Sequence, residues 1–87
     1  MIELKDTIAG MTSADYKERF KAEFYQAYIR LKKLEKLVED FKADVLDFIP
    51  DCPIQLLQEQ MWVMQTYVNV MLQRALVEEI NVMEGLF

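Results

Sequence analysis

Two apolar stripes with alternating steps of three and four residues constrain the fold of this chain more than any other feature. Such steps place all members of a stripe on one side of an α-helix, which is the pattern by which two helices pack along their length. The members are Phe20, Phe24, Ala27, Leu31, Leu34, Val38, Phe41 and Val45 in the first stripe, and Ile54, Leu57, Met61, Met64, Val68, Met71 and Ala75 in the second. The sequence therefore predicts an all-α protein with two long helices.

Capping residues and a glycine predict where the first long helix begins. A short helix over about residues 2–9 should end at Gly10, because glycine commonly follows the last turn of a helix. Thr12 or Ser13 then offers a hydroxyl that can cap the next helix. We expect this first long helix to cover about residues 13–45.

Two prolines separate the long helices. Pro50 disfavours helical geometry in the residue before it, and Pro53 is typical of the first residue of a helix, which makes Cys52 the expected N-cap. A second long helix is predicted over about residues 53–84, with Gly85 after its end. Because the turn is short, the two long helices should pack as an antiparallel hairpin.

The apolar content exceeds what a hairpin can bury. The 87 residues are 53% hydrophobic, which is high for a single short domain, 1–87. Further apolar residues surround the second long helix, namely Trp62, Val63, Tyr67, Val70, Leu72, Leu76 and Val77. Polar residues interrupt every apolar run before it reaches the roughly 18 residues of a membrane span. We therefore expect no membrane partner and a homo-oligomer that buries the remaining surface.

The inventory of reactive side chains argues against an enzyme. The chain has no histidine and one cysteine, Cys52, so the usual neutral-pH base, an activated thiol and a zinc site are not expected. Its two glycines, Gly10 and Gly85, lie too far apart for a phosphate-binding loop. We expect no catalytic residue, metal ligand or cofactor. A carboxylate-only magnesium or calcium site stays open, although no EF-hand spacing occurs.

The charge is distributed unevenly along the chain. The net charge is −5, but residues 17–36 contain seven basic and three acidic residues, so this segment carries +4 and the rest carries −9. An acidic protein is a poor partner for long nucleic acid, whose binding depends on neutralising many phosphates. A local basic stretch suits a small anionic ligand better.

Five side chains on the long helices are candidates for holding such a ligand. Arg19, Arg30 and Lys33 share one polar face, which is either a solvated, salt-bridged face or a phosphate-binding surface. Tyr16, one turn before Arg19, is either a stacking platform for a base or a half-buried tyrosine. Arg74 stands alone on an apolar helix, where it either snorkels at the surface or is aimed at an anion within an assembly.

Five segments, taken in order, resemble a known family. They are TSADYKERFKAEF (12–24), IRLKKL (29–34), CPIQLL (52–57), RA (74–75) and EGLF (84–87). Together they are similar to the small phage proteins that sequester cyclic oligonucleotides, the anti-CBASS sponge family. CBASS is a bacterial defence in which infection triggers the synthesis of a cyclic nucleotide signal. The resemblance covers nearly the whole chain beyond the first ten residues.

The resemblance implies a helical hexamer that acts in the host cell cytoplasm. It would bind cyclic dinucleotides such as 3',3'-cGAMP and cyclic trinucleotides such as cyclic triadenylate, in separate pockets between protomers, without cleaving them. The family's stacking tyrosine, phosphate-contacting lysine and last-helix arginine correspond to Tyr16, Lys33 and Arg74. Lys32 is a rival for Lys33, and Phe24 stands where a tyrosine is expected, so a hydroxyl contact at that position is lost.

A second hypothesis accounts for the apolar excess without a nucleotide. A helical adaptor or inhibitor would dock a host protein through a surface rich in methionine and aromatic residues. The oligomeric state separates the two hypotheses, because an adaptor of this kind is a monomer that exposes the surface.

Overall fold

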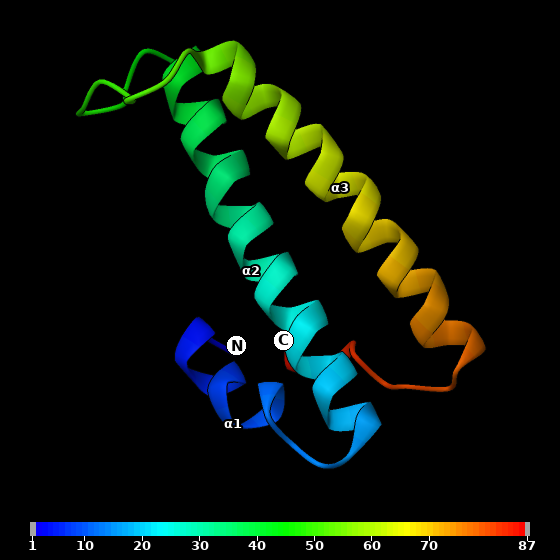
Figure 1. Ribbon diagram of the computed structural model, residues 1–87. Coiled ribbons are helices and arrows are strands. Elements are labelled where there is room, and N and C mark those ends of the chain that lie inside the picture. Colours follow the sequence, from blue (N-terminus) through cyan, green and yellow to red (C-terminus); the bar gives the residue numbers. More distant parts are fainter. Residues whose placement is uncertain (1, 87) are drawn as a thin grey trace.

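The computed structural model describes residues 2–86, and over that range it contains helices and no strand. Two long helices, α2 and α3, lie side by side in antiparallel directions, and the short elements gather at the end opposite the connecting loop (Figure 1). The elements are η1 (Leu4–Thr7), α1 (Ile8–Met11), α2 (Tyr16–Lys42), α3 (Ile54–Val77) and η2 (Glu84–Leu86). The predicted all-α architecture with a helical hairpin is confirmed.

Helix α2 begins at Tyr16, three residues later than the sequence predicted. Its N-cap is Asp15, whose carboxylate accepts a hydrogen bond of 2.9 Å from the backbone N–H of Lys17. The prediction that Thr12 or Ser13 caps the helix is wrong, because the Ser13 hydroxyl instead accepts from the N–H of Asp15 and shapes the turn before the helix. An ionised carboxylate also interacts more favourably with the positive end of the helix dipole than a hydroxyl does.

Helix α3 ends at Val77, well before the predicted end near residue 84. Glu79 has a φ of 58°, in the left-handed region, and the N–H of Ile80 bonds to the carbonyl of Ala75 at 2.8 Å. This is the Schellman arrangement that usually places glycine where Glu79 stands. The prediction that Gly85 ends the helix is therefore wrong, because the chain turns six residues earlier and Gly85 lies in η2.

The connection between the long helices also differs from the prediction at both of its ends. Helix α2 ends at Lys42 because Asp44 has a φ of 60° and the N–H of Val45 bonds to the carbonyl of Asp40 at 3.0 Å. Helix α3 takes Pro53 as its N-cap, one residue later than predicted. The proline ring fixes φ there and lacks the N–H that a helix start would leave unpaired.

The N-terminal segment forms two short pieces, η1 and α1, that pack against the first half of α2. Gly10 lies inside α1 without a positive φ, so the prediction that it ends this helix is wrong. A Cβ at Gly10 would lie 2.9 Å from the Cβ of Ala22, which is closer than real contacts allow. The glycine is therefore needed for the close approach of α1 to α2.

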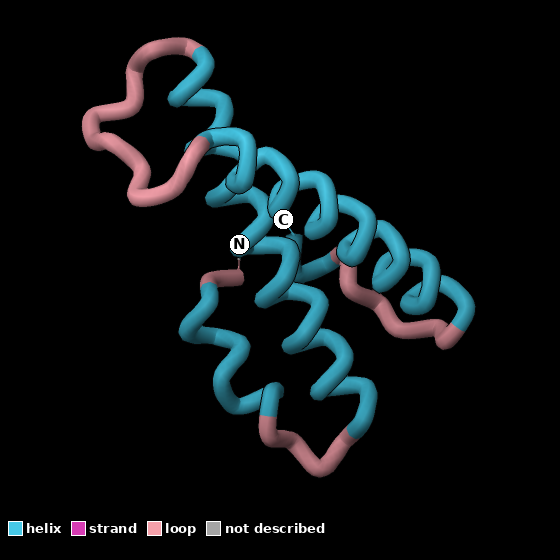
Figure 2. Tube along the Cα trace, turned by 45° about the horizontal axis from the view of Figure 1, so that its top comes forward, coloured by secondary structure: helices cyan, strands magenta, loops and turns pink. Residues whose placement is uncertain are grey.

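The core lies where the two stripes meet the segment that follows α3. Its buried members are Phe20, Phe24, Tyr25, Leu31, Val68, Met71, Ala75, Ile80 and Val82. Ile80 and Val82 belong to the segment that turns back from the end of α3 toward α2 (Figure 2). Near the connecting loop the residues of the first apolar stripe are no longer buried, and Phe41 and Val45 are exposed. The packing is therefore tightest at the end where the termini lie.

Helix α3 keeps a second apolar face that its own chain does not cover. Its exposed large apolar side chains are Leu56, Trp62, Val63, Tyr67, Val70, Leu76 and Val77. The prediction that a hairpin alone cannot bury both sides of this helix is confirmed. Among residues 2–86, no helix combines the length and the apolar content that crossing a membrane requires.

The core assignment predicts a large effect of truncating Phe24, which is only 1% exposed. Phe24→Ala should lower the free energy of unfolding by about 3–5 kcal/mol, because it removes buried surface and leaves a cavity. Urea denaturation followed by circular dichroism measures the loss. Phe48→Ala is the matched control, since Phe48 is 53% exposed in the connecting loop and should cost less than about 1 kcal/mol. Equal losses would contradict this core.

Candidate functional site

The start of α2 and the end of α3 meet in a three-residue network, here called the Tyr16 network, made of Tyr16, Arg74 and Glu78. The Tyr16 hydroxyl donates to Oε1 of Glu78 at 2.6 Å and accepts from Nη2 of Arg74 at 2.9 Å. The Arg74 Nε donates to Oε2 of Glu78 at 3.1 Å. Each member therefore contacts the other two, and the network joins residues that lie about sixty positions apart in the sequence.

Arg74 is not a stranded charge on an apolar helix. Its side chain is 48% exposed and its guanidinium lies 5.0 Å from the centre of the Phe20 ring. Its Nη1 has Sδ of Met71 at 3.9 Å, and sulfur is a weak acceptor. The arginine head lies at the surface and pairs with the carboxylate of Glu78 in the single chain, and its contact with an anion within an assembly stays a prediction.

The hydrogen bonds of the Tyr16 network change the pKa values of Glu78 and Tyr16. The hydrogen bond from Tyr16, followed by the contact with Arg74, holds the pKa of Glu78 below its ordinary value. The same bond raises the pKa of the Tyr16 hydroxyl. Because the folded state favours the ionised form of Glu78, the contribution of this group to stability is present at neutral pH. It is lost as the pH falls through the lowered pKa.

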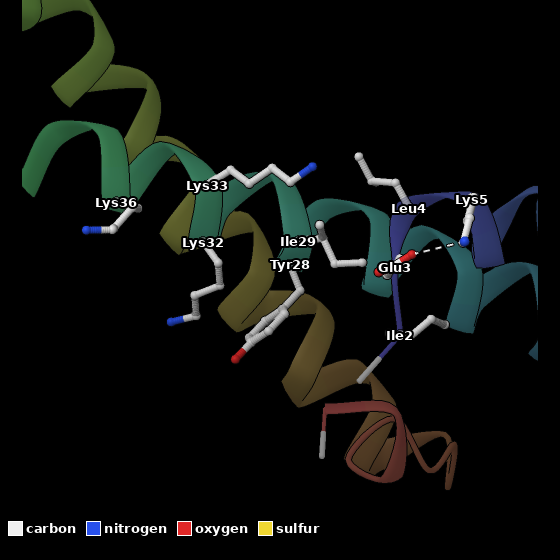
Figure 3. Close-up of a pocket in the computed structure, with 9 residues that line it drawn as sticks. All are labelled: Ile2, Glu3, Leu4, Lys5, Tyr28, Ile29, Lys32, Lys33 and Lys36. Atoms are coloured by element: carbon white, nitrogen blue, oxygen red, sulfur yellow. Dashed lines mark ion pairs between the residues drawn. The ribbon is translucent and has the colours of Figure 1, made fainter. Parts of the chain in front are cut away.

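A second cluster lies in a cavity of about 640 Å³ between the N-terminal segment and α2, here called the lysine groove (Figure 3). Its lining residues are Ile2, Glu3, Leu4, Lys5, Tyr28, Ile29, Lys32, Lys33 and Lys36. The lining carries four lysines against one glutamate, in a protein whose net charge is negative. The groove therefore combines local positive charge with an apolar and aromatic wall.

The four lysines of the groove differ in how their ammonium groups are engaged. Lys5 pairs with Glu3 at 3.4 Å, and Lys36 pairs with Asp40 at 2.7 Å. Lys32 pairs with Glu35 at 3.1 Å and also lies 5.2 Å from the centre of the Tyr28 ring. Within residues 2–86, Lys33 has no carboxylate within ion-pair distance, and Figure 3 shows its side chain extending toward Leu4. Lys33 is therefore the groove cation most available to an anion.

The structure divides the six predicted ligand-binding residues into separate groups. Tyr16 contacts Arg74 in the network, and Lys32 and Lys33 line the groove. Arg19 lies outside both clusters, because its Nη1 donates to the backbone carbonyl of Ser13 at 2.8 Å and holds the turn before α2. Arg30 is exposed and also lies outside both. The six residues therefore do not meet in one cluster of the single chain, and their contact with a ligand stays a prediction.

Sequence reasoning missed part of both clusters. Lys36 and Tyr28 belong to the same helix face as Lys32, so helical spacing was a usable signal for them. Lys5 had no such signal, because its place depends on how the N-terminal segment packs against α2. The same is true of Glu78, whose bond to Tyr16 depends on how the end of α3 packs against the start of α2. In the part of the chain that the structure describes, no group of three histidine, cysteine or acidic side chains is placed to hold a metal ion.

The geometry of the Tyr16 network predicts a measurable effect on Glu78. Tyr16→Phe removes the donating hydroxyl and keeps the ring, so the pKa of Glu78 should rise toward its ordinary value. An NMR titration of the Glu78 carboxyl carbon measures the change. Tyr28→Phe removes a hydroxyl from the same helix outside the network and should leave the pKa of Glu78 where it is. An unchanged value in Tyr16→Phe would show that the network does not form in solution.

Comparison with known proteins identifies one family. The family model described as Sequestin matches residues 14–76, which span α2, the connecting loop and nearly all of α3. Sequestin is the anti-CBASS cyclic-nucleotide sponge family. The matched span contains all six predicted ligand-binding residues, whereas residues 2–5, which form the other wall of the lysine groove, precede it. No curated protein and no solved structure matches the chain.

Proposed function

Because this chain belongs to the Sequestin family, we propose that it binds cyclic dinucleotides such as 3',3'-cGAMP and cyclic trinucleotides such as cyclic triadenylate without cleaving them. Holding these signals out of solution lowers their free concentration in the host cytoplasm and blocks CBASS defence. Such a role requires binding groups for phosphates and bases and no catalytic ones. The single observation that supports it best is the lysine groove.

The lysine groove has the chemistry that a cyclic nucleotide requires. Lysine ammonium groups act as point charges that attract phosphodiester oxygens, and Lys33 is the one without a competing carboxylate among the described residues. The ring of Tyr28 and the apolar side chains of Ile2 and Ile29 offer surfaces against which a base can pack. A volume of about 640 Å³ falls within the range typical of small-molecule sites.

The separation of the two clusters supports binding between protomers. Tyr16 and Lys33 are seventeen positions apart on α2, which places them roughly 25 Å apart along the helix axis. In one chain they cannot contact the same small ligand. If both contact one ligand, they come from different protomers, and if each contacts its own ligand, the protein has two kinds of site. The proposal of separate pockets for cyclic dinucleotides and trinucleotides accommodates either arrangement.

The uncovered face of α3 supports the proposal of a homo-oligomer, with a hexamer expected from the family. Seven large apolar side chains of this helix are exposed in the single chain, and Trp62 and Val70 are among them. A second copy of the chain would bury them by symmetry. The same exposure also favours the alternative function, in which the face docks a host protein as an adaptor. The mass of the purified protein under native conditions separates the two, because the adaptor predicts a monomer.

Ligand binding should be visible as a gain in thermal stability. At a ligand concentration about 100 times Kd, mass action stabilises the folded protein by about 2.7 kcal/mol, which raises the Tm of a domain of this size by roughly 10–20 °C. Differential scanning fluorimetry against 3',3'-cGAMP, cyclic triadenylate and linear dinucleotides measures the shift, with the linear compounds as controls. Chromatography of the heat-released ligand should return the cyclic compound intact. No shift with any cyclic nucleotide, or recovery of a cleaved product, would refute a sponge.

The lysine groove predicts which lysine matters. Lys33→Ala should weaken binding of the groove ligand about tenfold, because one charge-assisted contact to phosphate is lost. Lys32→Ala should have a smaller effect, since Lys32 already pairs with Glu35. Isothermal titration calorimetry measures both, and Lys42→Ala is the matched control, a lysine of the same helix outside the groove. A loss in Lys42→Ala equal to that in Lys33→Ala would show that only net charge matters.

A further inference from the structure

We propose that Glu78 is a built-in competitor: in the free protein its carboxylate occupies the place that a phosphodiester takes on Tyr16 and Arg74. Its displacement then sets how tightly this site holds a ligand. The inference rests on the proposed function for the identity of the natural ligand, but the competition itself concerns any small oxyanion. It assigns Glu78 a role in affinity that neither the family match nor the candidate residues include.

The geometry of the carboxylate supports this substitution. Its two oxygens are used separately: Oε1 accepts from the Tyr16 hydroxyl at 2.6 Å and Oε2 accepts from the Arg74 Nε at 3.1 Å. A phosphodiester also presents two oxygens on one centre with one negative charge shared between them. It can therefore accept from the same two donors, and arginine is well suited to this exchange because its planar fork fits carboxylate and phosphate alike.

The two donors are held in place by contacts that do not involve Glu78. The Arg74 Nη2 donates to the Tyr16 oxygen at 2.9 Å, and the guanidinium lies over the ring of Phe20. The Tyr16 and Phe20 rings are 6.3 Å apart between centroids. Removal of the carboxylate therefore leaves a hydroxyl and a guanidinium that still face the same space. The Arg74 Nη1, whose acceptor among residues 2–86 is the weakly accepting sulfur of Met71, supplies a further donor to an incoming anion.

The competing contact is weak enough to be displaced. Glu78 and Arg74 form an i,i+4 pair whose side chains are 31% and 48% exposed, and exposed pairs of this kind contribute little to stability. Glu78 is also the C-cap of α3, and its side chain stays partly exposed, so an anion from solvent can reach the place that its carboxylate occupies. A ligand must nevertheless displace it, and its apparent affinity falls by the fraction of molecules in which the carboxylate is in place.

The test compares Glu78→Gln with Glu79→Gln. Both remove one negative charge from adjacent positions, but the structure places only Glu78 in contact with Tyr16 and Arg74. The probe is inorganic phosphate, titrated while the NMR signals of the Arg74 Nε–H and the Tyr16 ring are followed. Phosphate should bind Glu78→Gln about threefold to tenfold more tightly than it binds Glu79→Gln or the unmodified protein.

Two results would overturn the inference. Equal phosphate affinity in the two variants would show that only net charge acts, and weaker binding in Glu78→Gln would show that the carboxylate orients the donors and does not compete. Glu78→Ala repeats the comparison without an amide that could take the place of the carboxylate, so a gain must appear in both variants of Glu78. A circular dichroism melt of each variant confirms that the hairpin is intact.

The design also separates this inference from the proposed function. Cyclic triadenylate and 3',3'-cGAMP are each titrated into phosphate-free samples of the unmodified protein, Glu78→Gln and Glu79→Gln. A gain for phosphate in Glu78→Gln, with no binding of any cyclic nucleotide to any of the proteins, would support the competitor and refute the sponge. Binding of cyclic triadenylate that is equal in Glu78→Gln and Glu79→Gln, with no difference for phosphate, would support the sponge and refute the competitor.

Discussion

Both candidate sites depend on the burial of one aromatic face of α2. Phe20, Phe24 and Tyr25 pack beneath α3 and the segment that follows it, and the neighbouring faces of α2 are left to the N-terminal segment. Burial of this aromatic surface stabilises the packing of α2 against α3 and the segment that follows it. The charged residues of both clusters lie at the edges of this core, so their positions are set by packing and not by their own weak ion pairs.

The hairpin could be predicted because it depends on apolar residues that recur with a helical period. The ends of its helices could not be predicted, because each end depends on the conformation of one or two individual residues. Alternating steps of three and four fix which sides of α2 and α3 meet. The ends instead depend on Asp15 as a cap and on Asp44 and Glu79 in the left-handed conformation. Glycine is the usual signal for such an end, and the two glycines of this chain serve other purposes. Gly85, for example, lies where a Cβ would be 2.4 Å from the Tyr25 ring.

The sequence predicts which residue types form the candidate site, but it does not predict which of these residues contact one another. A basic stretch, a tyrosine at the start of α2 and an arginine on the last helix are all visible in the sequence. The contact between Tyr16 and Arg74 depends on the axial register of α2 against α3. The apolar periodicity does not fix this register, because a shift of one helix along the other by a turn keeps the same faces together. That Lys5 lines the same groove as Lys33 depends on tertiary packing of a segment with no period of its own. The partnerships therefore required the structure.

The hydrogen bond from the N–H of Ile2 to the carbonyl of Gly85, at 3.3 Å, joins the two ends of the described chain beside the lysine groove. The two residues lie near opposite ends of the sequence. Forming this bond therefore restricts almost the whole intervening chain and costs the loop-closure entropy of a long loop. A nascent chain cannot form it until the residues around Gly85 have left the ribosome. Ile2, which lines the groove, is thus tethered by a residue from the far end of the described chain, and a chain that lacked the segment around Gly85 would lose this anchor of the groove wall.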